Sequence, residues 1–145
     1  MNTSRFTQKT MEALQSAQSL AIEYQNQALE PQHLLAALAG QENGLIPQLL
    51  TRMNVDPAAF RSAVVEKVAA LPHVSGSGRD PEKLYISQTP DKALQAAEKQ
   101  AEQMKDEYIS VEHVFFGILE NPGDCAEIFK AFGISKAGFL KLLAE

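Results

Sequence analysis

The sequence predicts an all-α protein with eight helices, arranged as two tandem four-helix repeats related by a pseudo-twofold axis. Three observations favour this fold class. Apolar residues recur every three to four positions in one segment after another. Good helix formers dominate a chain of 145 residues that contains no Trp. The second half of the chain also aligns with the first at a nearly constant offset of 80 residues.

The first half should form four helices. An apolar stripe predicts the first helix over about 6–24. Pro31 suits the first position of a second helix, and Gly40 stands where a left-handed cap would end it. A third helix should cover 45–52. An Asp-Pro pair then predicts the start of a fourth helix over 56–70, because the carboxylate can accept first-turn hydrogen bonds and proline lacks a donor that would have no partner there.

A linker should separate the halves over 72–83. Its two glycines, two serines and two prolines leave little to bury, and we expect 75–78 to be mobile. Repeat one then covers 1–71 and repeat two covers 84–145. We expect both to pack as a single domain, because each half alone would bury too little apolar surface to be stable.

The second half should repeat this pattern. A Thr-Pro pair at 89–90 predicts the start of the fifth helix, and Ser110 can cap the sixth. The seventh helix should span 124–132 and stop at Gly133. The eighth should begin at the cap Ser135.

Matched core positions establish the register of the repeat. At an offset of 80, Leu14 meets Leu94 and His33 meets His113. The offset becomes 79 after a one-residue deletion. The other matched pairs are Ala13/Ala93, Gln15/Gln95, Ala17/Ala97, Ala21/Ala101, Leu49/Ile128, Met53/Phe132, Val55/Ile134 and Phe60/Phe139. Two such units should meet at a seam, which is a natural place for a groove that accepts an apolar peptide.

Composition excludes several classes of partner. The chain carries 13 basic and 18 acidic side chains, a formal net charge of -5, which disfavours nucleic acid and anionic membrane surfaces. No stretch approaches the roughly 18 apolar residues of a membrane-spanning helix. The polar start at 1–10 has no apolar run typical of a signal peptide. We expect a cytoplasmic protein that binds neither nucleic acid nor membrane.

No motif in the sequence predicts catalysis. A phosphate-binding loop requires Gly-x-x-x-x-Gly-Lys followed by Ser or Thr, and this pattern does not occur. Cys125 is the single cysteine and has no His spaced to activate it, so we interpret it as a small buried residue. His33 and His113 lack the Cys, Asp or Glu cluster of a metal site, and a structural hydrogen bond explains both. We therefore expect no catalytic residue, no metal site and no cofactor.

Several short motifs follow one another along the chain: FTQK at 6–9, EPQHLLAAL at 30–38, PHVSGSG at 72–78, KDEYISVEH at 105–113 and FGI at 132–134. Together they resemble the amino-terminal domain of Clp ATPases, most closely that of the ClpB-type disaggregases. The resemblance covers the whole chain and implies an eight-helix tandem repeat, tethered flexibly ahead of two ATPase modules. The isolated domain would be monomeric and the parent protein hexameric. Gln32 departs from the Pro-Glu-His form of the family, which affects only local polar contacts of the first repeat.

The resemblance also implies a function. The domain would be a non-catalytic module that engages unfolded or aggregated polypeptides, with a co-chaperone or adaptor protein as a further partner and ATP used elsewhere in the parent protein. An alternative is the adaptor- and substrate-docking domain of a ClpA- or ClpC-type protease ATPase. A freestanding helical enzyme would require clustered titratable groups that the sequence lacks. The acidic charge balance disfavours a helix-turn-helix protein that binds DNA.

Three candidate site residues are apolar or aromatic. Tyr85 and Ile86 lie outside any apolar stripe and have no evident counterpart with an equivalent task. The preferred interpretation is that they are exposed and line a groove at the seam, and the alternative is that they pack beneath the linker. Leu94 either lies in the core, as its counterpart Leu14 suggests, or lines the same groove.

Three further candidates are polar. The resemblance implies a role for Thr7, Asp106 and Glu112 near the substrate-facing surface. Glu112 has a structural explanation as well, because the amide dipoles at a helix start favour negative charge. Asp106 lies before the predicted cap and lacks that explanation, so a functional role has more weight for it than for Glu112, beside a structural one.

Overall fold

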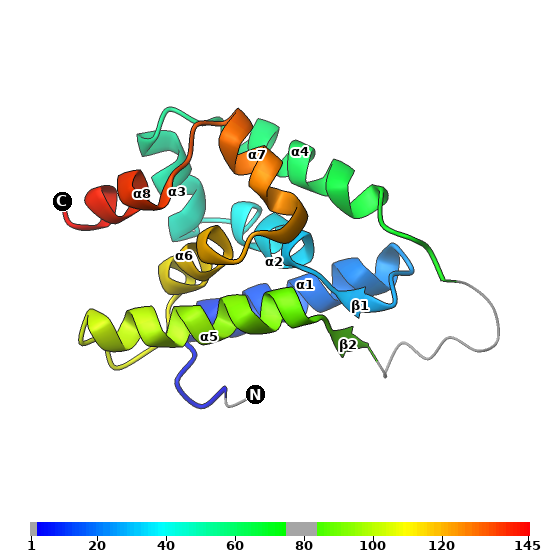
Figure 1. The fold of residues 1–145 in the computed structure, drawn as a ribbon, viewed down its shortest axis with the longest axis horizontal. Helices are drawn as coiled ribbons and strands as arrows, with labels where there is room; N and C mark the ends of the chain where they lie inside the picture. Colours follow the sequence, from blue (N-terminus) through cyan, green and yellow to red (C-terminus); the bar gives the residue numbers. More distant parts are fainter. Residues whose placement is uncertain (1–2, 75–83) are drawn as a thin grey trace.

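The computed structural model describes residues 3–74 and 84–145, which form eight α-helices, a 3-10 helix and two short strands (Figure 1). In chain order these are α1 Gln8–Glu23, β1 Ala28–Leu29, α2 Pro31–Ala39, α3 Leu45–Arg52, α4 Pro57–Ala69, β2 Tyr85–Ile86, α5 Gln88–Gln103, α6 Val111–Glu120, η2 Gly123–Cys125, α7 Ala126–Ala131 and α8 Lys136–Leu143. The predicted all-α class with eight helices is confirmed. The segment 75–78, for which the sequence predicts mobility, lies outside the described residues.

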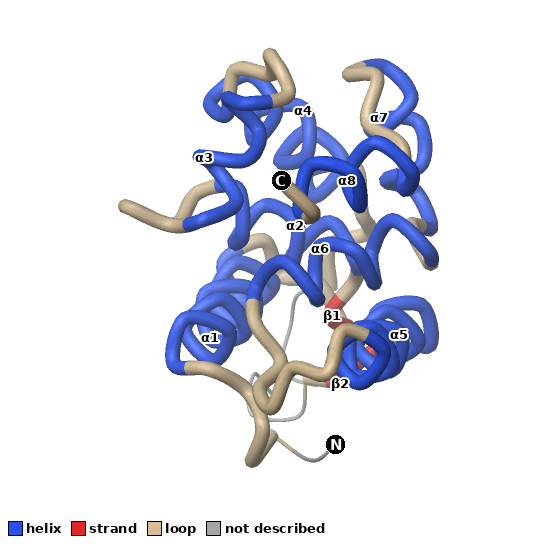
Figure 2. Tube along the Cα trace, turned by 90° about the vertical axis from the view of Figure 1, so that its left-hand side faces the viewer, coloured by secondary structure: helices blue, strands red, loops and turns tan. Residues whose placement is uncertain are grey.

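The helices form three layers, with α2 and α6 at the centre (Figures 1 and 2). The helices α1 and α5 lie side by side on one face of this pair, and α3, α4, α7 and α8 cover the other. All nine residues of α2 are buried, since it is covered on both faces. None of the helices within 3–74 and 84–145 is long and apolar enough to cross a bilayer.

Most helix starts use the predicted caps. The Oδ1 atom of Asp56 accepts a hydrogen bond from the Ala58 amide at 3.3 Å, and the Ser135 hydroxyl accepts one from the Gly138 amide at 3.0 Å. Ser110 caps α6 as predicted. These short polar side chains satisfy first-turn amides that have no partner inside the helix.

Three predicted boundaries are wrong. The fifth helix begins at Gln88 after the cap Ser87, because proline at position 90 fits anywhere in the first turn and so does not mark the first residue. Gly40 has φ of -98° and is no left-handed cap, since its amide stays bonded to the last turn of α2. The segment predicted as one helix over 124–132 is the 3-10 turn η2 followed by α7, which ends one residue earlier at Ala131.

Backbone conformation follows the repeat. The described residues with left-handed backbone fall into three pairs: Gln25 with Lys105 and Asn43 with Gly123 at an offset of 80, and Asn54 with Gly133 at 79. Their φ angles lie between 54° and 71°. Non-glycine residues rarely adopt this conformation, so its recurrence at matched positions indicates that the two halves share the same turns.

A single cluster of buried apolar residues contains side chains from both halves. Its largest members are aromatic: the rings of Phe115 and Phe139 have centroids 4.8 Å apart, and Phe60 contacts Phe132 at 5.3 Å. Gly117 permits a close contact between α5 and α6, because a Cβ atom there would lie 2.0 Å from the Ala93 carbonyl oxygen. The core therefore joins the halves instead of lying inside each.

Candidate functional site

Near the start of each half, a short segment pairs in parallel with a segment of the other half. The strands β1 and β2 are parallel, with Leu29 opposite Ile86. An isolated parallel bridge joins Phe6 to Ile109. Because 6 and 86, and likewise 29 and 109, differ by 80, the two pairings are equivalent. They lie at opposite ends of α5, whose 16 residues span about 24 Å.

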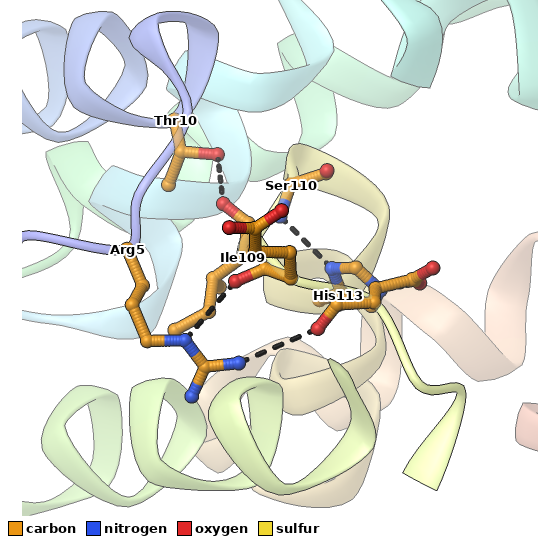
Figure 3. Close-up of polar contacts among 7 residues, drawn as sticks. Arg5, Thr10, Ile109, Ser110 and His113 are labelled. Carbon is orange, nitrogen blue, oxygen red and sulfur yellow. Dashed lines mark hydrogen bonds and ion pairs between the residues drawn. The ribbon is translucent and has the colours of Figure 1, made fainter. Parts of the chain in front are cut away.

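Arg5 closes the end that contains the Phe6–Ile109 bridge. Its Nε atom donates to the Glu107 carbonyl oxygen at 3.1 Å and its Nη2 atom to the Asp106 carbonyl oxygen at 3.4 Å (Figure 3). Its Nη1 atom also lies 3.5 Å from the Glu102 carboxylate. Phe6 is only 9% exposed beneath this arrangement. We refer to this region, Arg5 and Phe6 with 106–109, as the closed end.

A histidine fixes the turn before the central helix of each half. The Nδ1 atom of His33 accepts a hydrogen bond from the Glu30 amide at 2.8 Å, which leaves Nε2 to donate to the Asn26 Oδ1 atom at 2.8 Å. His113 makes the equivalent pair of contacts, with the Ser110 amide and the Asp106 carboxylate, each at 2.8 Å.

These contacts confirm the prediction of a structural hydrogen bond at both histidines. Both ring nitrogens of His33 are engaged, and burial lowers the pKa of this imidazole to about 4. Within 3–74 and 84–145, no group of three His, Cys, Asp or Glu residues could hold a metal ion.

Cys125 is fully buried, and burial raises the pKa of its thiol to about 12, so the thiol is not a nucleophile at neutral pH.

The other end, at β1 and β2, is open. Tyr85 is 63% exposed and Ile86 is 41% exposed, as predicted. The statement that they lack equivalent counterparts is wrong, because the offset of 80 matches them to Arg5 and Phe6 of the closed end. The difference in exposure follows from chemistry: Arg5 donates hydrogen bonds across its neighbouring turn, and no hydrogen bond links the tyrosine to the equivalent turn within the described residues.

A cleft of about 420 Å³ lies beside these strands. Its walls are the turn between α1 and α2, the chain that follows α4, and β2. The Val74 amide donates to the Gln25 carbonyl oxygen at 2.7 Å, and the Asn26 side-chain amide donates to the Pro72 carbonyl oxygen at 3.2 Å. The lining residues are Asn26, Gln27, Ala28, Glu30, Leu71, Pro72, Val74, Tyr85 and Ser87. We call this region, with Tyr85 and Ile86, the open end.

Glu30 places a carboxylate in the cleft. Its Oε2 atom accepts a hydrogen bond from the Ser87 hydroxyl at 3.0 Å. Burial raises the pKa of this carboxyl, the Ser87 hydroxyl partly opposes the rise, and the negative charge of Asp124 adds to it. No ion pair to Glu30 occurs within the part of the chain that the structure describes.

The structure does not bring the six predicted site residues together. Tyr85 and Ile86 lie at the open end. Leu94 is only 3% exposed and belongs to the core, like its counterpart in α1.

The three polar candidates lie around the closed end. Thr7 caps α1 through a hydrogen bond from the Thr10 amide to its hydroxyl at 3.1 Å. Asp106 is exposed and bonds to His113. Glu112 lies in the first turn of α6, and its Oε1 atom is buried without a hydrogen-bond partner among the described residues.

Sequence analysis missed the polar residues of the cleft: Asn26, Glu30 and Ser87. One signal could have found them. Applying the offset of 80 to the first motif, FTQK at 6–9, identifies ISQT at 86–89 as its counterpart. Because Phe6 pairs with Ile109, that match assigns Ile86 to Leu29, two positions before α2, and so places Tyr85 beside the 25–30 turn.

Comparison with known proteins supports the resemblance. The family model described as the Clp repeat (R) N-terminal domain matches residues 5–132. The chaperone protein ClpB of Bacillus anthracis is 39% identical over 143 residues, which is 99% of this chain and 16% of that protein. ClpB of Nitratidesulfovibrio vulgaris is 37% identical over 147 residues, 100% of this chain and 17% of that protein. The chain thus spans about a sixth of these relatives. The crystal structure of the Hsp104 N-terminal domain from Candida albicans has a TM-score of 0.82 and 25% identity, and the match covers 98% of this chain and 91% of that one.

Proposed function

The chain belongs to the Clp repeat N-terminal domain family, and from this premise we propose that it binds exposed apolar segments of unfolded or aggregated polypeptides for a ClpB-type chaperone. The open end is the site of this binding. One observation carries the proposal: Tyr85 and Ile86 are exposed beside an open cleft at a position where the other half of the molecule buries a phenylalanine. Exposed apolar patches on proteins often mark interaction sites.

The cleft suits an extended chain. Its volume of about 420 Å³ falls at the lower end of the range for small ligand sites and accommodates a few side chains. Leu71 and Val74 contribute apolar lining to the same cleft as the tyrosine and form its apolar wall. Binding should be weak, because a mobile client loses conformational freedom on docking and the cleft offers little area in return. Weak binding suits a domain that passes its client to a motor.

The domain contributes no catalysis in this proposal. ATP hydrolysis would take place in other modules of a hexameric parent protein in the cytoplasm, and an adaptor or co-chaperone would be a second kind of partner. The alternative is an adaptor-docking domain of a ClpA- or ClpC-type protease ATPase. Identity of 37–39% to the matched sixth of two ClpB proteins, over nearly all of this chain, favours the disaggregase assignment.

A double substitution, Tyr85→Ser with Ile86→Ser, tests the proposal. We expect it to lower the affinity of the isolated domain for fluorescently labelled, unfolded casein at least fivefold, with the melting temperature nearly unchanged because both side chains are exposed. Tyr108→Ser is the matched control, since this tyrosine belongs to the closed end and is 52% exposed. A double variant that keeps its affinity for casein contradicts the open end as the client site.

A further inference from the structure

We propose that the open end selects segments in which an arginine precedes an apolar residue, and that the guanidinium sits between the Glu30 carboxylate and the backbone carbonyls of Asn26 and Gln27. This inference rests on the proposed function and names the class of client that the cleft prefers. The closed end of the molecule itself already contains such a segment, Arg5 followed by Phe6.

At the closed end, Arg5 and Phe6 act as an internal model of the ligand. Arginine comes first and donates to the backbone carbonyls of Asp106 and Glu107, while the phenylalanine after it is buried. Phe6 pairs in parallel with Ile109. Ser4 and Arg5 form a turn just before it, closed by a hydrogen bond from the Phe6 amide to the Thr3 carbonyl oxygen at 3.1 Å. A guanidinium is well suited to this task because its several N–H donors form a planar fork.

The open end keeps the same turn without the arginine. The counterparts of Asp106 and Glu107 are Asn26 and Gln27. Both turns begin with a left-handed residue, at φ of 56° and 60°. In both, the next amide bonds to the preceding helix at 2.9 Å, from Asn26 to the Ala21 carbonyl and from Asp106 to the Ala101 carbonyl. The two backbones are therefore alike, but Tyr85 replaces arginine at the open end.

The open end also carries a negative charge at a position where the closed end has a neutral side chain, which likewise favours a cationic ligand at the open end. Glu30 occupies the cap position that Ser110 occupies at the closed end. This carboxylate is partly buried and lines the cleft, and it accepts from the Ser87 hydroxyl and, in the capping box of α2, from the His33 amide. No cationic side chain among the described residues forms an ion pair with it. A partly desolvated carboxylate without a cation gains most from a charge-assisted hydrogen bond. The open end thus presents two carbonyls and one carboxylate to an incoming cation.

Tyr85 contributes a further preference. Its ring is exposed at the edge of the cleft that contains Glu30. An arginine that enters the cleft can stack on this ring, which favours arginine over lysine because the planar guanidinium makes both stacking and cation–π contacts. The apolar residue that follows arginine would then contact Ile86 and the wall formed by Leu71 and Val74.

Two peptides test the inference: acetyl-Thr-Ser-Arg-Phe-Thr-amide, which copies residues 3–7, and its analogue with Gln in place of Arg. Each is titrated into the ¹⁵N-labelled domain, and amide shifts give affinity and location. We expect the arginine peptide to bind about tenfold more tightly than the glutamine analogue, with the largest shifts at the open end. Raising the salt concentration should reduce this difference.

Glu30→Gln should abolish the preference for arginine while leaving the affinity for the glutamine analogue unchanged. Glu98→Gln, which removes the same charge from an exposed position of α5, should keep the preference. If Glu30→Gln folds poorly, Glu30→Ser replaces it, because serine already caps the equivalent helix in the second half.

Three results would overturn the inference: equal affinities of the two peptides for the wild-type domain, an arginine preference that survives in Glu30→Gln, or shifts confined to the closed end. These outcomes are separate from failure of the proposed function. If casein binding depends on Tyr85 and Ile86 but the two peptides bind alike, the site is correct and the arginine preference is wrong. If the affinity for casein does not depend on Tyr85 and Ile86, the proposed function itself is wrong.

Discussion

Phe6 and Ile86 occupy equivalent positions in the two halves of the molecule but differ in burial. Each pairs in parallel with the residue that lies two positions before a central helix, Ile109 for Phe6 and Leu29 for Ile86. Phe6 is 9% exposed, whereas Ile86 is 41% exposed. Duplication therefore produced two copies of one backbone arrangement, of which one is closed by its own side chains and the other is left accessible.

Truncating these two side chains should have unequal effects on stability. We expect Phe6→Ala to lower the free energy of unfolding by about 3 kcal/mol, because it removes a buried ring from the core. Ile86→Ala should cost less than about 1 kcal/mol, because much of its side chain is already in water. Urea unfolding monitored by circular dichroism measures both. Equal losses would contradict the distinction between a closed and an open end.

Stability should depend on pH through His33. Its pKa is about 6.5 in the unfolded chain and about 4 in the folded protein, where burial disfavours the charged imidazole. Between these values the unfolded state binds a proton that the folded state does not, so stability falls as pH falls. The loss amounts to about 3 kcal/mol between pH 6.5 and 4. Urea unfolding at half-unit pH steps measures it.

Asn26→Asp tests this contribution through the slope of the pH profile, because it gives His33 the carboxylate partner that His113 already has. It also removes the hydrogen bond to the Pro72 carbonyl oxygen, so the slopes and not the absolute stabilities are compared. A neighbouring carboxylate favours the imidazolium, so we expect a shallower fall in stability toward pH 4 than in the wild type. The control is Gln27→Asp, which adds the same charge to an exposed side chain beside the turn. Parallel pH profiles for Asn26→Asp and the wild type would rule out His33 as the source.

Gly117→Ala should destabilise the domain by about 2 kcal/mol. The new Cβ atom would lie 2.0 Å from the Ala93 carbonyl oxygen, so α5 and α6 would have to move apart, which outweighs the gain in helix propensity. Gly138→Ala in α8 is the matched control and should be neutral or slightly stabilising, because its nearest neighbour is the Ser135 hydroxyl at 3.1 Å. Thermal melts compare the two. A Gly117→Ala variant as stable as the control would show that the helices can separate at little cost.

The isolated domain should not bind ATP. The sequence has no Gly-x-x-x-x-Gly-Lys loop whose amides and lysine could hold the phosphates. Calorimetric titration with Mg-ATP should give only heats of dilution. A saturable heat signal would reveal a nucleotide site that neither the motifs nor the family match anticipates.

Sequence patterns predicted the helices better than the site, for physical reasons. Apolar periodicity and short polar caps are local, so α1, α3 and α4 begin and end within about two residues of their expected bounds, and α8 begins directly after its expected cap. Leu94 could be matched to Leu14 and so to the core. The exact repeat boundaries, 1–71 and 84–145, stay a prediction.

The site depended on contacts between distant segments. Nothing in the local pattern around Glu30 indicates that Ser87 will approach it across the linker, and periodicity carries no information on strand pairs of two residues. The exposure of Tyr85 was predictable because it lies outside an apolar stripe. The sequence did not predict that the three polar candidates lie at the opposite end, because their position depends on the antiparallel arrangement of α1 and α5. These candidates are Thr7, Asp106 and Glu112.

The two parallel pairings between the halves, Phe6 with Ile109 and Leu29 with Ile86, also constrain the order of folding events during synthesis. Phe6 cannot reach its pairing partner until residue 109 has left the ribosome, and Leu29 must wait for residue 86. The first half therefore emerges with its leading segment unpaired and completes its fold only when the second half arrives. Contacts this distant in sequence raise the contact order above that of an ordinary helical bundle, so folding should be slower than helical content alone suggests.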